Sequence, residues 1–233
     1  MTNIQSWLRA SMKRRHFLGA VVIGSTIMRH SDHGAFAQPS APGKSPATNP
    51  RLFTFIGGDT GVWSISDTRR IVGDPWLPAK KLSVVNSPAP DGMKAHWQLR
   101  GVVSNERYVT RVDKDDLVKR QEGLGRPGAS HAALIPIKKN AAWWALTQDE
   151  RRDIFEEQSH HTAIGLKYLP AVARRLHHCR DLGTDEPFDF LTWFEFSTSS
   201  APTFNLLLDE LRATKEWTYV EREVEVRLVR DQV

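Results

Sequence analysis

The sequence predicts an α+β fold, in which helices cover one face of an open sheet. One observation indicates a globular chain and the other indicates this arrangement of elements. The apolar patterns of the second half follow the order strand, helix, helix, strand, helix, strand, and such a succession builds an α+β sheet. The composition is that of an ordinary globular protein, since 40% of the 233 residues are hydrophobic and 25% are charged.

The first half of the folded region contributes short strands and one helix. Aromatic and β-branched residues predict strands over 51–56 and 61–65, joined by a turn at Gly57-Gly58-Asp59. Further strands are predicted over 97–103 and 107–112. Residues 114–122 suit a short helix that ends at Gly123.

The second half begins with a short apolar run over 132–137, which predicts a buried strand. The capping-box pattern from Thr147 to Glu150 opens a helix that reaches about residue 158. The segment 159–181 follows as helix, and Pro170 could kink it or start a new one. The remaining elements are a strand over 188–196, a helix over 202–213 and a strand over 217–229.

The N-terminal residues 1–37 have the three parts of an export signal. Lys13, Arg14 and Arg15 form the charged start, 17–28 the apolar core, and Ala35-Phe36-Ala37 a small-x-small cleavage site. The core is about 12 residues, short of the roughly 20 that span a bilayer, so no membrane anchor is expected after cleavage. The run KRRHFL resembles the twin-arginine export motif; an ordinary secretory signal that holds two arginines is the alternative, and Met1 or Met12 could be the true start.

The same residues explain most of the positive charge. The chain has 32 Lys and Arg against 27 Asp and Glu, and 1–37 hold five of the basic residues and one of the acidic ones. The rest is therefore nearly neutral, with 27 basic and 26 acidic residues. No nucleic-acid partner is expected from such a balance. Residues 38–50, rich in Pro, Ser and Ala, are predicted to be a disordered linker, and 51–233 the folded domain.

The candidate chemistry lies in the segment 159–181, which contains four histidines and the single cysteine, Cys179. His161 and Arg174 are 13 residues apart, which in an unbroken helix is about 20 Å of rise, so their spacing alone decides nothing. The histidine pairs His160-His161 and His177-His178 could equally be surface or helix-end imidazoles. Zinc is a weaker interpretation, because adjacent histidines point to different sides of a helix. No Cys-x-x-Cys-His occurs, so haem is not attached covalently in the c-type manner.

Several motifs in order resemble the chlorite dismutase family. They are IPIKKNAAWWALTQDERR, SHHTAIGLKYLPAVARRLHHCRDL, EPFDFLTWFEF and LRATKEWTYVEREVEVRL, with RGVVSNERYVTR as a looser match upstream. The chain is similar to the short-subunit branch. That resemblance implies a ferredoxin-like, dimeric α+β barrel with an antiparallel sheet, in which 51–128 are a truncated N-terminal half and 129–233 the haem-binding half.

The resemblance also assigns roles to residues around a haem b. It implies His161 as the proximal iron ligand, with its neighbour His160 as the fallback. Glu216 aligns with the family's proximal glutamate and would accept the other N–H of that imidazole. Arg174 aligns with the distal arginine, whose permanent charge suits capture of a small oxyanion. His177, His178 and Cys179 are then interpreted as structural.

Further residues are carried over by the same resemblance. Trp143 and Trp144 match the family's tryptophan pair, and Trp144 is expected to border the haem on the proximal side, with plain core packing as the alternative. Tyr108 and Lys138 are candidates for the haem propionates. Gln121 could hold Arg174 in one of its rotamers. For these last three, a surface or turn position is an equally open interpretation.

The activity implied by the resemblance is conversion of chlorite to chloride and dioxygen, through ferric iron, an iron-oxo state and transient hypochlorite. A homodimer in the periplasm is expected. Two alternatives stay open. A coproheme decarboxylase would generally lack an arginine at position 174, and a periplasmic haem-binding or sensing protein without turnover would need only His161.

Overall fold

The computed structural model describes residues 49–86, 88–90, 92–104, 107–183 and 185–231. The predicted export signal, 1–37, lies outside these ranges, as do residues 38–48 of the predicted linker. Both therefore stay predictions.

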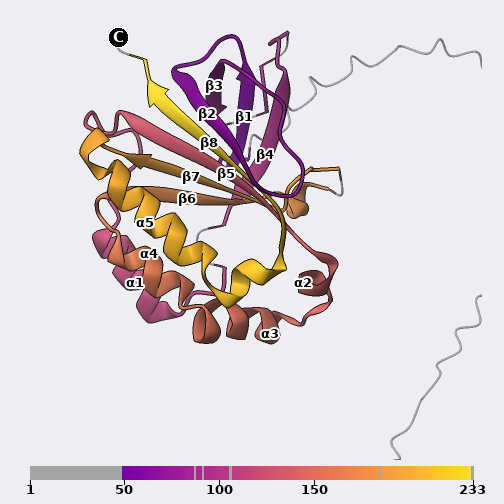
Figure 1. Ribbon diagram of the computed structural model, residues 1–233, viewed down its shortest axis with the longest axis vertical. Coiled ribbons are helices and arrows are strands. Elements are labelled where there is room, and N and C mark those ends of the chain that lie inside the picture. The colour runs from indigo at the N-terminus through magenta and orange to yellow at the C-terminus, as the bar shows by residue number, and fades with distance from the viewer. Residues whose placement is uncertain (1–48, 87, 91, 105–106, 184, 232–233) are drawn as a thin grey trace, which may run out of the picture. The chain divides into compact units, whose positions relative to one another are not determined.

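Eight strands of the described chain form a closed barrel in the order β1-β3-β2-β8-β5-β7-β6-β4 (Figure 1). Every neighbouring pair is antiparallel. The strands are β1 (Leu52–Gly58), β2 (Trp63–Val72), β3 (Lys81–Val85), β4 (Trp97–Val103), β5 (His131–Lys139), β6 (Val172–His178), β7 (Phe190–Phe196) and β8 (Val220–Arg230). The open sheet predicted from the element order is wrong, because β4 pairs with both β1 and β6 and so closes the ring.

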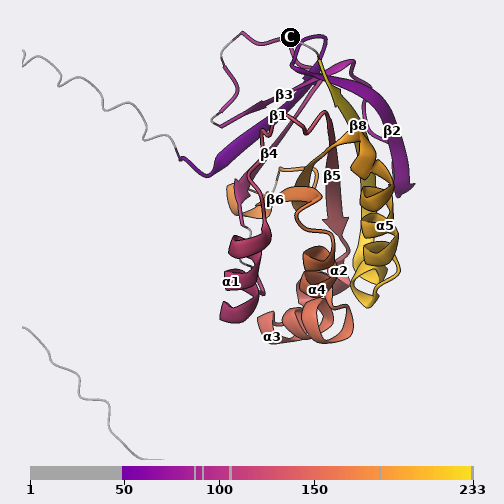
Figure 2. The same ribbon diagram turned by 90° about the vertical axis from the view of Figure 1, so that its left-hand side faces the viewer.

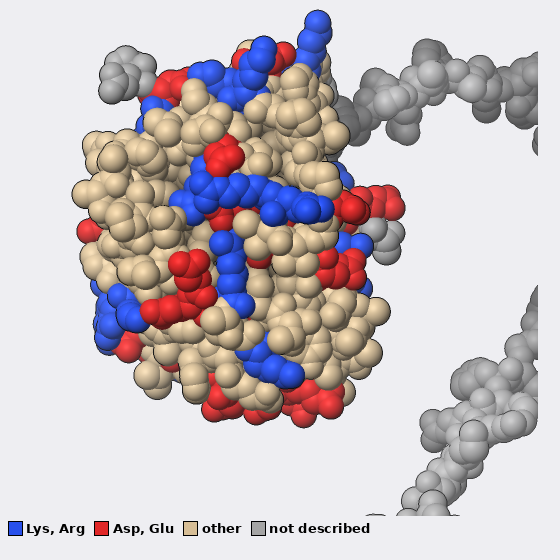
Figure 3. Space-filling model, in the orientation of Figure 1, with Lys and Arg blue, Asp and Glu red and all other residues tan. Residues whose placement is uncertain are grey.

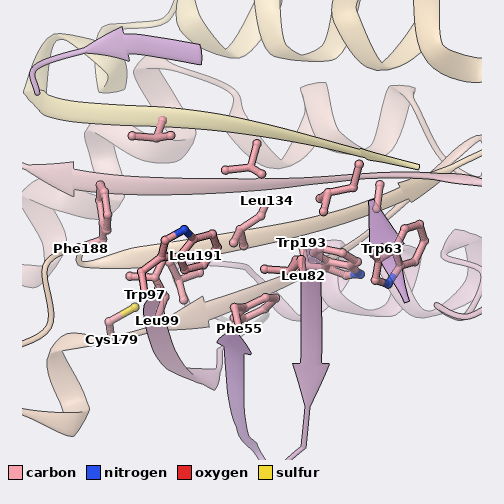
Figure 4. Close-up of a cluster of buried hydrophobic side chains, with 14 residues drawn as sticks. Phe55, Trp63, Leu82, Trp97, Leu99, Leu134, Cys179, Phe188, Leu191 and Trp193 are labelled. Carbon is pink, nitrogen blue, oxygen red and sulfur yellow. The ribbon is translucent and has the colours of Figure 1, made fainter. Parts of the chain in front are cut away.

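The sheet has two apolar faces, because successive side chains of a strand point to opposite sides. One set of residues fills the barrel interior, where Trp63, Trp97 and Trp193 pack with aliphatic side chains (Figure 4). The alternate residues of β5 and β7, such as Ile135 and Phe194, belong to a second cluster with the helices. This double burial explains why both strands are almost continuously apolar.

The helices α1 (Arg111–Arg120), α4 (His161–Lys167) and α5 (Ala201–Arg212) gather on one side of the sheet, away from β1 and β3 (Figures 1 and 2). Helix α5 confirms the prediction over 202–213. It buries Phe204, Leu207, Leu208 and Leu211 at helical spacing against the outer face of the sheet. The expected helices on one face of an antiparallel sheet are thus present.

The helix predicted over 159–181, with a kink or a new start at Pro170, is present only in its first part, and the prediction after Pro170 is wrong. Helix α4 ends at Lys167, and Val172–His178 form β6 between β7 and β4. The apolar residues Val172 and Leu176 are four apart, so they fit a helical stripe and one face of a strand equally well. Pairing on both edges of β6 decides for the strand, since the sheet supplies partners that an isolated segment lacks.

Three other segments differ from the predictions. Residues 107–112 are no strand: Tyr108 has φ of 69° in a turn, and Thr110 caps α1 through a capping box with Asp113. The strand β3 was not predicted. The helix expected over 148–158 divides into α3 (Gln148–Arg152) and a π-helical turn, η1 (Asp153–Gln158), after the short helix α2 (Ala141–Ala145). A 3₁₀ turn, η4 (Lys215–Tyr219), precedes β8.

The surface carries charges of both signs. Basic and acidic side chains are interspersed on the face shown in Figure 3, in keeping with the near balance of charge after residue 37. Among the described residues, none of the helices has the length and apolar character needed to cross a membrane.

Candidate functional site

A cavity of about 290 Å³ lies between the outer face of the sheet and the helices. Strands β5, β6 and β7 supply one wall. Helices α1, α4 and α5 supply much of the rest, together with residues 107–109 and side chains from α2, η1 and η4. Its apolar lining consists of Ile135, Ile137, Leu176, Phe190, Phe194, Leu208 and Leu211, among others. A few polar side chains project between them, notably Tyr108, Lys139, His161, Arg174 and Glu216. A mostly apolar pocket with a few placed polar groups is typical of a small-molecule or cofactor site.

His161 is the first residue of α4, and it lines this cavity. Its Nδ1 lies 2.7 Å from Oε2 of Glu216, and its ring stacks on Phe155 with the centroids 4.1 Å apart. Because the carboxylate engages Nδ1, Nε2 is the nitrogen left to bind a metal. The neighbouring His160 is exposed, caps α4 with φ of 50° and does not line the cavity.

Glu216 is buried in η4 and connects three elements. Its Oε1 accepts a hydrogen bond from Nζ of Lys139 at 2.8 Å, and its backbone N–H donates to Oγ of Ser159 at 2.9 Å. Burial by itself raises the pKa of Glu216, but the charges and hydrogen bonds of Lys139 and His161 outweigh it and lower the pKa to about 2. The carboxylate is therefore an anion at neutral pH.

Arg174 enters the cavity from β6 because side chains alternate along a strand. Leu176 lies on the same face, whereas Arg175 points to the other side, where it lies over the Phe53 ring at 3.6 Å. Burial lowers the pKa of Arg174 to about 10, with some opposition from the carboxylate of Glu156. Among the described residues, no hydrogen bond or ion pair engages its guanidinium. The group is thus charged at neutral pH, with donors available to an anion.

Three more donors around the cavity are buried without a hydrogen-bond partner among the described residues. They are Nε of Arg107, the hydroxyl of Tyr108 and Nε1 of Trp143. All three residues line the cavity. An unpaired buried donor is costly, so this group suits a ligand that brings acceptor atoms of its own.

The other residues predicted for the site differ in whether they line the cavity. Gln121 lines the cavity, and its Nε2 donates to the backbone carbonyl of Arg174 at 2.9 Å rather than binding the guanidinium. Lys138 lies outside, where Nζ pairs with the exposed Glu221 at 2.8 Å. A contact of Lys138 with a haem propionate stays a prediction.

The two tryptophans separate in the same way. Trp143 is buried, lines the cavity and has the Lys139 ammonium 4.8 Å from its ring centroid. Trp144 does not line the cavity: its Nε1 donates to Asp189 at 3.2 Å, and the guanidinium of Arg180 lies 3.9 Å from its ring. Trp143 and His161 therefore line the same cavity, whereas Trp144 lies outside it.

The sequence interpretation missed Lys139 and Phe155. A signal existed for Lys139, because Ile135, Ile137 and Lys139 share one face of a strand by simple alternation, while Lys138 faces away. For Phe155 there was none, since the π-helical turn that presents it has no distinct pattern.

The remaining histidines and the cysteine of the segment lie elsewhere. His177 projects into the barrel interior, where Nδ1 donates to the Leu191 carbonyl at 3.0 Å and burial lowers its pKa to about 3. Cys179 is a buried free thiol whose pKa is raised by burial. His178 is buried against the Phe190 ring. Within the described ranges, no group of three or more His, Cys, Asp or Glu side chains could hold a metal ion.

Comparisons with known proteins agree on one family. The family model described as chlorite dismutase matches residues 82–230. Among curated proteins, the chlorite dismutase of Ideonella dechloratans is 35% identical over 123 residues, which are 52% of this chain and 40% of that protein. The match therefore spans less than half the length of that relative.

Solved structures extend the likeness over the described fold. The dimeric chlorite dismutase of Nitrobacter winogradskyi is 55% identical with a TM-score of 0.70, covering 76% of this chain and 99% of that chain. A variant of the chlorite dismutase from Candidatus Nitrospira defluvii is 20% identical with a TM-score of 0.53, covering 79% and 93%. At that identity the second match bears on the fold alone.

Proposed function

Because this chain belongs to the chlorite dismutase family, we propose that it converts chlorite to chloride and dioxygen with a bound haem b. One chlorite ion supplies both oxygen atoms, so the reaction balances without an external electron donor. The observation that carries the proposal is the common cavity of His161 and Arg174. This one cavity contains a possible metal ligand and a guanidinium that has no hydrogen bond or ion pair among the described residues.

The residues of the cavity fit a haem. The apolar walls suit the macrocycle, and Nε2 of His161 suits the iron. The unpaired donors of Arg107, Tyr108 and Trp143 suit acceptor atoms such as carboxylates at the edge of the group. When bound, the haem would supply the iron on which the chlorine–oxygen bonds of chlorite are exchanged for an oxygen–oxygen bond.

His161 would hold the iron, and Glu216 would set the character of that ligand. A carboxylate at Nδ1 fixes the tautomer and the orientation of the ring and makes Nε2 a stronger donor. Lys139 competes for the same carboxylate. The Lys139–Glu216 pair therefore limits how much negative charge reaches the imidazole.

Arg174 would attract chlorite and retain small anions. Its guanidinium is charged at neutral pH, since its pKa is about 10. Apolar surroundings such as the walls of this cavity strengthen the attraction between a cation and an anion. The same walls would keep water away from the reacting atoms.

We also propose that the protein is exported to the periplasm through the signal in 1–37. The paired arginines Arg14 and Arg15 support the twin-arginine route. Replacing both by Lys in the full chain should leave the protein in the cytoplasmic fraction. Unchanged export would contradict that route and favour the ordinary secretory one.

A homodimer is the assembly that we propose, since the relative from Nitrobacter winogradskyi is described as dimeric. Light scattering of the purified, haem-loaded protein measures the mass directly. A mass twice that of one chain is expected. The mass of a single chain at every protein concentration would contradict the proposal.

The function is tested by loading the purified protein with haem b, adding chlorite, and following dioxygen with an electrode and chloride by ion chromatography. One dioxygen and one chloride per chlorite are expected. A stable haem complex that releases no dioxygen would favour a haem-binding or sensing protein. Conversion of added coprohaem to haem b in the presence of peroxide would favour the decarboxylase instead.

A further inference from the structure

Gly165 occupies a position in α4 that its backbone does not explain. It lies inside the helix, where glycine is less favourable than alanine. Its backbone does not adopt the left-handed conformation that would call for glycine. The reason for a glycine must therefore lie in what approaches it.

The group that approaches Gly165 is the guanidinium of Arg174. A Cβ placed on Gly165 would lie 2.1 Å from Nη1 of Arg174, 2.5 Å from Cζ and 2.5 Å from Nη2. All three nearest atoms belong to that one group, so the guanidinium rests directly on the helix backbone. Apart from its two neighbours in the chain, no other described residue has a side chain as near to this position.

This contact replaces the partners that usually fix an arginine. The described residues offer its guanidinium no hydrogen bond or ion pair, and the only charge that acts on it notably is the carboxylate of Glu156. Packing on Gly165 therefore sets where the guanidinium lies, while its N–H donors stay available.

Gly165 also stands in a fixed relation to His161. The two residues are four apart in α4, so they share one face of the helix about 6 Å apart along its axis. A guanidinium seated on Gly165 is held one helical turn from the residue that bears the imidazole.

We propose that Gly165 is a positioning residue, whose missing side chain forms the seat that holds the Arg174 guanidinium inside the cavity. The proposal rests on the proposed function in one respect, that Arg174 binds a small anion there. A methyl group at position 165 would lie 2.1 Å from Nη1 of Arg174 if nothing moved. The guanidinium would therefore have to withdraw until the two atoms are at least 3.4 Å apart, the distance of ordinary contact. Because the displaced atoms are the end of a flexible side chain, the fold would tolerate the change.

The test compares Gly165→Ala with Ala163→Ser, which adds one heavy atom to an exposed position of the same helix. Nitrite, a small bent oxyanion, is titrated into the ferric haem-loaded proteins and followed by absorbance. Gly165→Ala should weaken nitrite binding roughly tenfold, the scale of one lost hydrogen bond to a charged group. Ala163→Ser should bind as the natural protein does.

A second background separates positioning from a general effect on the helix. In Arg174→Ala, the further change Gly165→Ala should leave the nitrite affinity unaltered, because no guanidinium remains to be displaced. An equal loss of affinity in both backgrounds would overturn the proposal. So would an unaltered affinity in the single variant.

A third measurement does not depend on haem. Labelling of Arg174 by phenylglyoxal, read by peptide mass spectrometry on folded protein, should be faster in Gly165→Ala than in the natural protein or in Ala163→Ser. Equal labelling rates in the three proteins would overturn the proposal that Gly165 positions the Arg174 guanidinium. If chlorite yields no dioxygen while the nitrite coupling and the labelling behave as expected, the proposed function fails and the role of Gly165 stands.

Discussion

Nδ1 of His161 lies 2.7 Å from a carboxylate oxygen of Glu216, whose other oxygen accepts a hydrogen bond from Lys139. This chain of contacts joins α4, η4 and β5. The Lys139 and Glu216 side chains are only 3% and 6% exposed. The orientation of the imidazole therefore depends on a buried ion pair, and the pair is a place where a single change should have a large effect.

Lys139→Met should destabilise the protein by about 3–5 kcal/mol, because it removes the ammonium group that neutralises the buried charge of Glu216. The adjacent Lys138 is the matched control, since its pair with Glu221 is exposed. Lys138→Met should cost no more than about 1 kcal/mol. Urea denaturation measures both, and adding Glu216→Gln to Lys139→Met should restore part of the loss. Equal stability of the two methionine variants would contradict the buried pair.

His177 should make stability depend on pH in the acid range. Burial lowers its pKa from 6.5 to about 3, so below pH 6.5 the unfolded chain binds a proton that the folded protein refuses. The stability it contributes is complete above that value and falls as the pH drops towards 3. Between pH 7 and pH 5, the natural protein should lose about 2 kcal/mol more than His177→Gln, which can keep a donor and an acceptor. Urea denaturation at the two pH values measures the stability of both proteins. An equal loss of stability in the natural protein and in His177→Gln would contradict the prediction.

Haem binding should distinguish the two adjacent histidines. His161→Ala should lose most of the haem, because it removes the ring that faces the cavity. His160→Asn should retain it, since asparagine tolerates the left-handed conformation of the helix cap. Haem titration by absorbance measures both affinities. Loss of haem in His160→Asn with retention in His161→Ala would mean that the ligand is the neighbouring residue.

The tryptophan pair offers a second distinction. Trp143→Phe should change the haem absorbance spectrum and weaken haem retention, because Trp143 lines the cavity. Trp144→Phe removes the hydrogen bond to Asp189 and reduces the ring that the Arg180 guanidinium contacts, so it should lower stability by about 1–2 kcal/mol with little spectral change. A reversed pattern would show that Trp144 borders the cofactor, as the family resemblance implied.

Replacing the cation should affect turnover more than haem binding. Arg174→Ala is expected to release dioxygen at least roughly tenfold more slowly, as the loss of a charge-assisted interaction implies, and to bleach its haem sooner. Arg70→Ala, an exposed arginine of β2, is the control. Equal rates and equal bleaching in the two variants would remove Arg174 from the mechanism.

The sequence predicted much of the strands β5, β7 and β8 and of helix α5, but it did not predict the strand that carries Arg174. Alternating or helical apolar patterns are unambiguous where they are long, as in β8 and α5. The run after Pro170 is short, and its apolar spacing satisfies both periods, so only pairing with β7 and β4 resolves it. Closure of the barrel agrees with what the family resemblance implied, but no local pattern predicted it, because it depends on contacts between β1 and β4.

The site was predictable in its chemistry and less so in its geometry. His161, Glu216 and Arg174 came from motifs that resemble a family, and the cavity brings these three together. The choices between Lys138 and Lys139 and between Trp143 and Trp144 depend on a one-residue shift in which side a side chain faces. The seat at Gly165 appears only in the fold, where the Arg174 guanidinium lies against Gly165, since the two residues have no periodic relation in the sequence.

The origin of the evolved oxygen tests the central claim most directly. Haem-loaded protein is given unlabelled chlorite in water enriched in oxygen-18, and the dioxygen is analysed by mass spectrometry while chloride is counted. The account predicts one unlabelled dioxygen for each chloride, because both oxygen atoms come from one chlorite ion. No dioxygen, or dioxygen that carries an atom from the solvent, would contradict it.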